Sequence, residues 1–185
     1  MNRRYGGIAL IVIGFWLALM PNIVLGGEVL TDRQKKEIVY GMYEEYRKEF
    51  PDVREISPSV AMKEMALGKI LFVDTRKPAE MAVSILPGAI TREEFLKDPE
   101  RFKDRRVVVY CTISYRSGKL ARKMANKGIE IFNLRGGLLA WVLEGGKVYN
   151  SNGKETRRIN VYGEKWDYPP KGYESVRLGF FERYF

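Results

Sequence analysis

Short runs that are apolar throughout alternate with segments of helical periodicity from residue 53 onward, and this alternation restricts the fold more than any other feature. The clearest apolar runs are residues 70–73 and 107–110. A strand without polar residues must be covered on both faces, and strands that alternate with helices pair in parallel. The sequence therefore predicts an α/β fold: a doubly wound parallel sheet with helices on both faces.

The other expected elements continue the alternation, and a length of 185 residues favours a single domain. Further strands are expected at residues 53–57 and 131–134, and helices at residues 58–67, 93–102, 117–127 and after the pair Gly136 and Gly137. A separate helix within residues 28–52 precedes them, because Thr31 can cap it and Pro51 ends it after Phe50.

Residues 1–27 differ in character from the rest of the chain. Arg3 and Arg4 precede an apolar stretch, and Pro21 and small residues follow it, an order typical of a secretory signal peptide. Alternatively, residues 8–25 form an uncleaved anchor in the inner membrane, since a crossing takes ~20 residues. Both interpretations predict an exported chain, periplasmic or otherwise extracytoplasmic, that meets a membrane only through this segment.

The composition excludes several classes of site. The chain contains no histidine, which removes the commonest general base and metal ligand. Its one cysteine, Cys111, cannot form an internal disulfide or supply the several ligands of a structural metal site, so we expect no metal and no cofactor. The net charge of +9 lies in mixed clusters, which favours attraction of a small anion over nucleic-acid binding.

Cys111 is either a core residue or a reactive thiol, because free cysteine is among the most frequently buried residue types. It directly follows the apolar run 107–110, and a helix is expected to begin at Ser117. Ligands of an open parallel sheet bind at the carboxyl ends of its strands, where loop amides and a helix N-terminus favour an anion. Arg116 adds a full positive charge, so we expect the Cys111 thiol to ionise readily.

Four motifs, together spanning roughly residues 53–149, resemble those of the rhodanese family of sulfurtransferases. They are residues 70–76 with Glu80, which resemble the family's strand ending in Asp-x-Arg; residues 86–90, similar to its Pro-Gly-Ala signature; residues 111–117, similar to its active-site loop; and residues 134–137 with Trp141, similar to its closing glycine pair and tryptophan. The resemblance implies an exported single-domain sulfurtransferase with a rhodanese-like domain at residues 53–149.

The resemblance also implies a mechanism. The Cys111 thiolate would take the sulfane sulfur of a small anion such as thiosulfate, become a persulfide and pass the sulfur to a thiol or cyanide acceptor. The amides of the loop would cradle the persulfide, and the implied binding residues are Thr112, Ile113, Ser114, Tyr115, Arg116 and Ser117. Arg116 would bind the donor's oxyanion, and whether the Tyr115 and Ser117 side chains contact substrate stays open.

Two positions depart from the family pattern. Ser114 stands where the family commonly has glycine, and a positive φ there would strain the serine. Residues 83–85 lack a histidine often seen in the family, a position that we interpret as structural. Among the other motif residues, Asp74 and Arg76 are expected to hold the end of their strand by internal ion pairs, and Trp141 is expected in the core.

The last segment, residues 150–185, is rich in aromatic residues and unlike a disordered tail. We expect it to fold back onto the α/β core, and the alternative is a surface for a protein partner or a membrane.

Two functions are alternatives to the sulfurtransferase: a non-catalytic rhodanese-fold binding module, or a persulfide carrier acting through a protein partner. The fold's phosphatase and arsenate-reductase relatives fit less well, because their cysteine-to-arginine loop is longer than residues 111–116.

Overall fold

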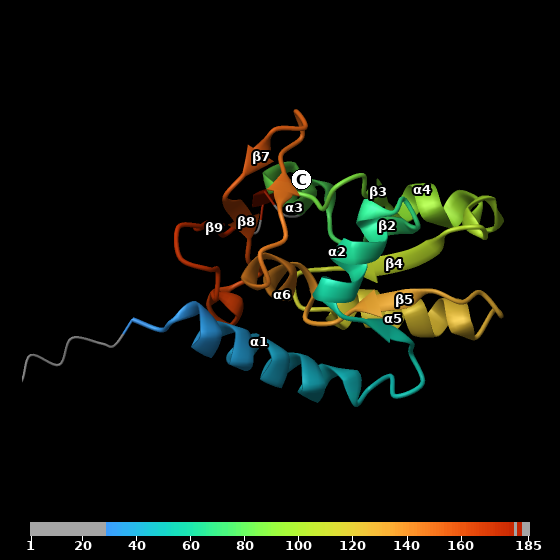
Figure 1. Ribbon diagram of the computed structural model, residues 1–185, viewed down its shortest axis with the longest axis horizontal. Helices are drawn as coiled ribbons and strands as arrows, with labels where there is room; N and C mark the ends of the chain where they lie inside the picture. Colours follow the sequence, from blue (N-terminus) through green and yellow to red (C-terminus); the bar gives the residue numbers. More distant parts are fainter. Residues whose placement is uncertain (1–28, 180, 183–185) are drawn as a thin grey trace, which may run out of the picture.

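A five-stranded sheet forms the centre of the computed structural model, which describes residues 29–179 and 181–182 (Figure 1). In spatial order its strands are β1 (Glu55–Ile56), β5 (Phe132–Leu134), β4 (Arg106–Tyr110), β2 (Ile70–Asp74) and β3 (Ile90–Thr91). All neighbouring strands are parallel, and the longest pairing joins β2 to β4 with Phe72 opposite Val108. The predicted parallel sheet is confirmed.

The two faces of the sheet contribute to two separate clusters of buried residues. Ile70 and Phe72 of β2 belong to one cluster, and Leu71 and Val73 belong to the other. Residues of α1 (Asp32–Arg47), α2 (Pro58–Ala66) and α6 (Gly137–Leu143) complete the first cluster, and residues of α4 (Arg92–Lys97) and α5 (Tyr115–Ala125) complete the second. These strands are apolar throughout because both of their faces are buried, which confirms the doubly wound architecture.

Helix α1 is packed against the rest of the fold. Thr31 and Gln34 form a capping box at its start, as the position of Thr31 predicted. Val39 and Tyr43 are fully buried on the face that meets α5 and α6. The helix ends at Arg47, before the expected end at Phe50.

Two elements of the α/β core were not predicted, and one predicted helix is divided. The unpredicted elements are α3 (Pro78–Val83) and β3, both too short to show a periodic pattern. The helix expected at 93–102 is split into α4 and the 3-10 helix η1 (Pro99–Phe102), because Pro99 lacks an N–H and disfavours helical geometry before it. Helix α5 begins at Tyr115 rather than at Ser117.

The segment after the sheet folds back onto the first cluster. It contains the hairpin β6 (Val148–Tyr149) and β7 (Glu155–Thr156), the parallel pair β8 (Arg158–Asn160) and β9 (Glu174–Val176), and the 3-10 helix η2 (Glu164–Trp166). Ile159 and Val161 are fully buried, and Trp166, Tyr168 and Tyr173 pack against the same cluster. Of the two interpretations of this segment, packing on the core is therefore confirmed for its described part.

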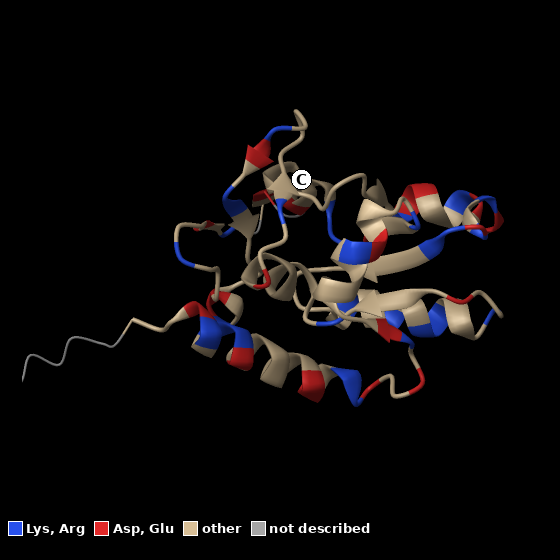
Figure 2. Cartoon of the chain, in the orientation of Figure 1, with Lys and Arg blue, Asp and Glu red and all other residues tan. Residues whose placement is uncertain are grey.

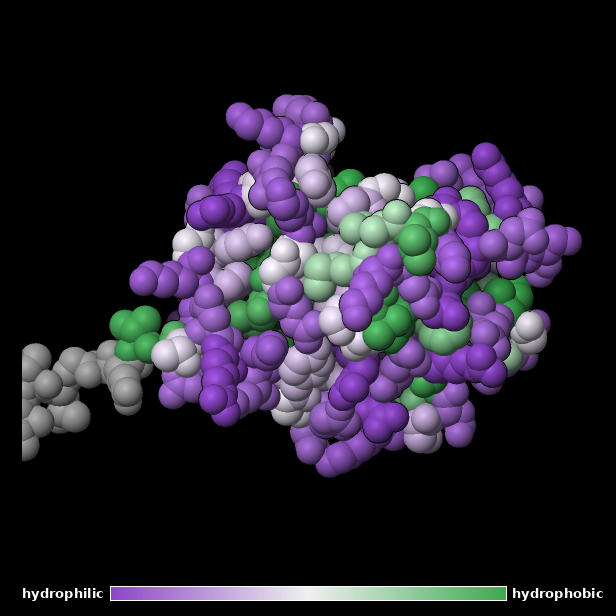
Figure 3. Space-filling view, in the orientation of Figure 1, coloured by the Kyte–Doolittle hydropathy of each residue, from purple (hydrophilic) through white to green (hydrophobic). Residues whose placement is uncertain are grey.

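The expected signal peptide or anchor, residues 1–27, lies outside the described residues. Of the helices in the described part, none combines the length and the apolar character needed to cross a bilayer. Basic and acidic residues are interspersed along α1 and over the other elements (Figure 2), and hydrophilic residues cover most of the face drawn in Figure 3. This mixed surface agrees with the solvated surface that the charge pattern indicated.

Candidate active site

Cys111 directly follows β4, at the carboxyl edge of the sheet, where the sequence placed it. The residue is only 2% exposed, yet it lines a pocket of about 430 Å³. The pocket is lined by Tyr46, Lys77, Cys111, Thr112, Ile113, Tyr115, Arg116, Tyr162 and Trp166. Its position at a pocket distinguishes Cys111 from an ordinary core cysteine of equal burial.

The start of α6 fixes the direction of the loop's peptide groups. The N–H of Leu138 donates to the carbonyl of Cys111 at 2.9 Å, and the N–H of Leu139 donates to that of Thr112 at 3.2 Å. Because the N–H of a trans peptide points opposite to its carbonyl, the N–H groups of Thr112 and Ile113 face away from α6. Both residues line the pocket, and donation from their amides to an anion there stays a prediction.

The glycine pair permits this close approach of α6. Gly137 has a φ of +60°, and a Cβ at this residue would lie 2.4 Å from the carbonyl oxygen of Cys111. Gly136 has a φ of +64° and caps the helix. The sequence predicted a tight turn here, and the structure adds the contact of its backbone with the active-site loop.

Ser114 adopts the strained conformation that the sequence analysis anticipated. Its φ is +71°, a region that residues with a Cβ rarely occupy. The serine hydroxyl donates to the carbonyl of Leu134, and the side-chain amide of Asn133 donates to the carbonyl of Ser114 at 3.1 Å. These bonds offset part of the strain and tie the loop to β5.

Ser117 and Tyr115, whose roles the sequence left open, lie in different surroundings. Ser117 is fully buried, does not line the pocket, and donates from its hydroxyl to Asn133 at 2.7 Å. Tyr115 lines the pocket, and its hydroxyl donates to Glu49 at 3.1 Å. Of these two side chains only that of Tyr115 is therefore placed to meet a molecule in the pocket.

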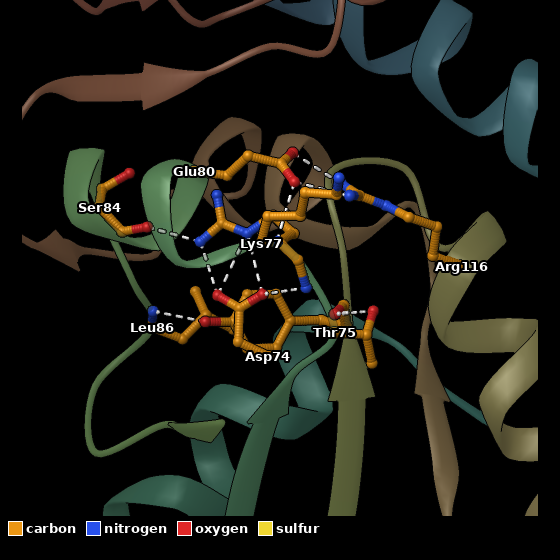
Figure 4. A network of polar contacts seen from close by, with 9 residues as sticks. Asp74, Thr75, Lys77, Glu80, Ser84, Leu86 and Arg116 are labelled. Carbon is orange, nitrogen blue, oxygen red and sulfur yellow. Dashed lines mark hydrogen bonds and ion pairs between the residues drawn. The ribbon is translucent and has the colours of Figure 1, made fainter. Parts of the chain in front are cut away.

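Arg116 forms a two-pronged ion pair with Glu80 of α3, at 2.6 and 2.8 Å (Figure 4). Burial opposes ionisation of Glu80 most strongly, but the hydrogen bonds and charge of Arg116 hold the pKa of Glu80 below its usual value. Burial likewise acts against the charge of Arg116, and the hydrogen bond with Glu80 and the charge of Cys111 together raise the pKa of Arg116. The guanidinium is therefore charged, and Glu80 holds it at the pocket that Cys111 also lines.

This pairing adds a residue that sequence reasoning had missed. Glu80 was noted only as part of a family motif, and nothing in the sequence showed that it meets Arg116. A guanidinium has five N–H donors, so the two bonds to Glu80 leave others for an anion in the pocket. The expected contact of Arg116 with a donor oxyanion is thus compatible with the ion pair.

Asp74 and Arg76 form the internal ion pair that the sequence predicted. Both side chains are fully buried, at 2.6 Å from each other, and Arg76 also donates to the carbonyl of Ser84 at 2.5 Å (Figure 4). The hydroxyl of Tyr110, at the end of β4, accepts from the N–H of Leu86 at 3.1 Å. The network holds the carboxyl ends of β2 and β4 beneath the pocket and has no exposed member to offer a substrate.

Three aromatic residues of the pocket lie outside the predicted site. Tyr46 comes from α1, Trp166 comes from η2, and Tyr162 lies shortly before η2. The signal for Tyr162 and Trp166 in the sequence was the aromatic richness of residues 150–185, whereas Tyr46 stood only in the helical pattern within residues 28–52. Trp141, expected in the core, is fully buried and donates its indole N–H to the carbonyl of Lys147 at 2.9 Å.

The geometry defines an α/β protein with a single-cysteine loop at the carboxyl edge of a parallel sheet, and comparisons with known proteins agree. The family model for the Rhodanese-like domain matches residues 57–144. The chain is 36% identical over 98 residues to a protein named Sulfurtransferase from Allochromatium vinosum, covering 50% of this chain and 92% of that protein. The chain belongs to the rhodanese-like domain family.

The chain is also similar to another curated protein and to solved structures. The chain is 34% identical over 117 residues to a tRNA sulfurtransferase of Desulfurococcus amylolyticus, covering 59% of this chain and 23% of that protein. Among solved structures, the thiosulfate sulfurtransferase of Pseudomonas aeruginosa has 21% identity and a TM-score of 0.48, covering 64% of this chain and 24% of that one. A rhodanese-related protein from Thermoplasma volcanium has 22% identity and a TM-score of 0.43, covering 51% and 96%.

Proposed function

We propose that this protein is a sulfurtransferase that carries sulfane sulfur as a persulfide on Cys111. The observation that supports it most is that Cys111 and Arg116 line the same pocket, where Glu80 holds the guanidinium in place. The thiolate is the nucleophilic form of cysteine, and Arg116 supplies a positive charge at the same pocket in a chain without histidine. Membership in the rhodanese-like family and relatives that are named sulfurtransferases also support this proposed function.

We take thiosulfate as the model donor. The Cys111 thiolate attacks the outer sulfur of thiosulfate, a bond forms between the two sulfurs, and the sulfur–sulfur bond of thiosulfate breaks. Its bonding electrons leave with sulfite, so the charge balances and no oxidant is consumed. Arg116 and the amides of Thr112 and Ile113 stabilise the negative charge that gathers at the loop.

The second step returns the enzyme to its starting state. A thiolate acceptor attacks the outer sulfur of the Cys111 persulfide, the new persulfide leaves, and the electrons of the broken bond return to Cys111 as thiolate. The start of α5 adds the positive end of its dipole to the same point, which stabilises Cys111 as the leaving group.

Mass spectrometry of the intact protein tests the proposal. After incubation with thiosulfate, we expect a mass increase of one sulfur atom that dithiothreitol removes, and no such increase for Cys111→Ser. The variant should unfold at the same urea concentration as the wild type, because serine nearly matches the size of cysteine. If no sulfane donor adds sulfur to Cys111, the protein is instead a non-catalytic module that has kept the rhodanese fold.

The leader-like residues 1–27 support a second proposal, that the protein acts outside the cytoplasm. In this view its partners are a small sulfur-containing anion and a thiol acceptor, and it meets the membrane only through this segment. The same mass spectrum of the native protein would show whether the chain starts at Met1 or after residue 27. A chain found intact in the soluble cytoplasmic fraction would contradict export.

A further inference from the structure

Four aromatic side chains that line the pocket contact one another in series, and we call these residues, Tyr46, Tyr115, Tyr162 and Trp166, the aromatic wall. The ring of Tyr46 lies 5.2 Å from that of Tyr115, and the ring of Tyr162 lies 5.5 Å from that of Trp166. The indole N–H of Trp166 donates to the hydroxyl of Tyr46 at 3.1 Å and joins the two halves.

Most of the wall lies outside the part of the chain that matches the family. Only Tyr115 falls within residues 57–144, while Tyr46 belongs to α1 and the other two to the C-terminal segment. The chain therefore adds an apolar surface to a loop whose chemistry does not require one. An added surface beside a reactive group is a means of selecting the molecule that reaches it.

The size and lining of the pocket suit an organic molecule better than an inorganic anion. Its volume of about 430 Å³ falls within the range of ~300–1,000 Å³ that is typical of pockets for organic ligands. Thiosulfate is small and strongly hydrated, and aromatic rings offer it no hydrogen bonds in exchange for its water. An aromatic ring would instead gain favourable stacked or edge-on contacts with these rings.

Polar groups of the same pocket define the rest of the ligand. Lys77 and Arg116 bring positive charge to its lining, and the guanidinium carbon of Arg116 lies 5.6 Å from the ring centre of Tyr162. The hydroxyl of Thr112 is buried at the pocket and has no hydrogen-bond partner among the described residues. A buried hydroxyl in this state is satisfied when a polar ligand group occupies the pocket.

We propose that the aromatic wall selects a small organic anion bearing a thiol as the sulfur acceptor of Cys111. The ligand has an apolar body against the wall, a negative charge near Lys77 and Arg116, and a sulfur directed at the Cys111 persulfide. Its thiolate takes the outer sulfur, the bond to Cys111 breaks, and Cys111 leaves as thiolate. The inference rests on the proposed persulfide chemistry and adds the class of acceptor.

The test compares two acceptors and two variants. The persulfide is loaded with thiosulfate, and the rate constant for its discharge is measured with 4-mercaptobenzoate and with cyanide. We expect Tyr162→Ala to slow discharge to 4-mercaptobenzoate about tenfold and discharge to cyanide less than twofold. Tyr162 is 37% exposed, so its replacement should leave the fold intact.

Tyr168→Ala is the matched control. Tyr168 is also a partly buried aromatic residue of the C-terminal segment, but it does not line the pocket. We expect it to change neither rate constant more than twofold. Equal losses with both acceptors in Tyr162→Ala, or equal effects of the two variants, would overturn the inference.

A binding measurement separates this inference from the proposed function. Calorimetry with 4-(methylthio)benzoate, which cannot accept sulfur, uses the Cys111→Ser protein with and without Tyr162→Ala. If Tyr162→Ala weakens binding of the analogue but the protein with Cys111 intact takes up sulfur from no donor, the sulfur chemistry is refuted and recognition of the organic anion is supported. Persulfide formation from thiosulfate without binding of the analogue would refute the role of the wall and leave the sulfurtransferase standing.

Discussion

The part of the chain that matches the family supplies the thiol and the charges of the pocket, whereas the flanking segments supply three of its four aromatic residues. In the matched part, Cys111 and Arg116 are held by neighbours that are themselves deeply buried. In the flanks, Tyr46 and Trp166 meet through one hydrogen bond between partly exposed side chains. In the proposed function, reactivity and selection of the reacting molecule would therefore come from separable parts.

The two parts also differ in how much a single substitution should cost. Breaking a buried ion pair such as that of Asp74 and Arg76 leaves an uncompensated charge, which is strongly destabilising. A contact between partly exposed side chains contributes far less, because water replaces what is lost. Substitutions of the buried neighbours that hold Cys111 and Arg116 should therefore impair sulfur loading itself, and those of the flanking aromatic residues should affect only the choice of acceptor.

Gly137→Ala should have the largest effect. The new methyl group would lie 2.4 Å from the carbonyl oxygen of Cys111 in a backbone with a φ of +60°, so the loop or α6 must move. The left-handed conformation and the overpacking together should destabilise the fold by ~3 kcal/mol. A loop displaced by ~1 Å should load sulfur about 100-fold more slowly.

Gly145→Ala controls for the conformational part of this effect. Gly145 has a φ of +86°, and no atom lies within 4 Å of the place that a methyl group would take, so alanine there meets strain but no clash. Urea unfolding should show a loss of ~1–2 kcal/mol, and sulfur loading from thiosulfate should stay at the wild-type rate. Equal loading rates in the two variants would show that α6 does not fix the loop.

Glu80→Gln should have the next largest effect. Glutamine has the shape of glutamate but cannot hold the guanidinium of Arg116 by two charged hydrogen bonds, so Arg116 loses its position beside Cys111. We expect sulfur loading to fall about tenfold and stability to fall by ~1–2 kcal/mol, since Arg116 is partly exposed to solvent. Faster loading would instead mean that Glu80 shields Arg116 from the donor.

A surface pair provides the control for Glu80→Gln. Glu130 and Arg54 lie 2.8 Å apart, but both side chains are more than half exposed. Glu130→Gln should change stability by less than ~0.5 kcal/mol and leave loading unchanged. A comparable loss in both variants would indicate a general effect of net charge on the protein.

The stability difference between wild type and Glu80→Gln should depend on pH. Arg116 holds the pKa of folded Glu80 below the ordinary carboxyl value of 4.5, so the folded state binds the proton less tightly than the unfolded state. The pair therefore stabilises the fold above pH 4.5, and its contribution declines as the pH falls through the lowered pKa. Urea unfolding at a series of pH values should show the two proteins converging in acid.

Two substitutions of Ser114 test whether the loop backbone is strained, and we expect them to change stability less than Gly137→Ala does. Ser114→Ala keeps the φ of +71° and loses the hydroxyl bond to Leu134, so we expect a loss of ~1–2 kcal/mol. Ser114→Gly loses the same bond but removes the strain, so its stability should stay within ~1 kcal/mol of the wild type. If urea unfolding gives the two variants equal stabilities, the left-handed backbone at residue 114 carries no strain.

The main sheet could be predicted from the sequence because its signal is local. Strands β2 and β4 are apolar on both faces and therefore conspicuous, and the cap at Thr31 marks the start of α1. Strand β3 has only two half-buried residues and α3 only six residues, so neither has room for a recognisable period. Local patterns predict an element only where it is long enough to repeat them.

The residues of the site could likewise be predicted only where they lie close together in the sequence. Cys111 and Arg116 could be assigned because they lie in one loop between a strand and a helix. Glu80 is 36 residues from Arg116, and Trp166 is 120 residues from Tyr46. Which distant side chains meet is decided by tertiary packing, and composition alone could indicate only that residues 150–185 pack somewhere.

Trp166→Phe should have the smallest effect. It tests most closely whether the flanking aromatic residues act only in selecting the acceptor. Phenylalanine keeps a ring against Tyr162 but removes the indole N–H that bonds to the hydroxyl of Tyr46. We expect stability to fall by ~0.5 kcal/mol and discharge to 4-mercaptobenzoate to slow about twofold, with loading from thiosulfate unchanged. Tyr46→Phe removes the same bond from the other side, so the double variant should be no slower than either single one. If Trp166→Phe slows loading as much as discharge, the flanks take part in the chemistry itself, and the separation of reactivity from selection fails.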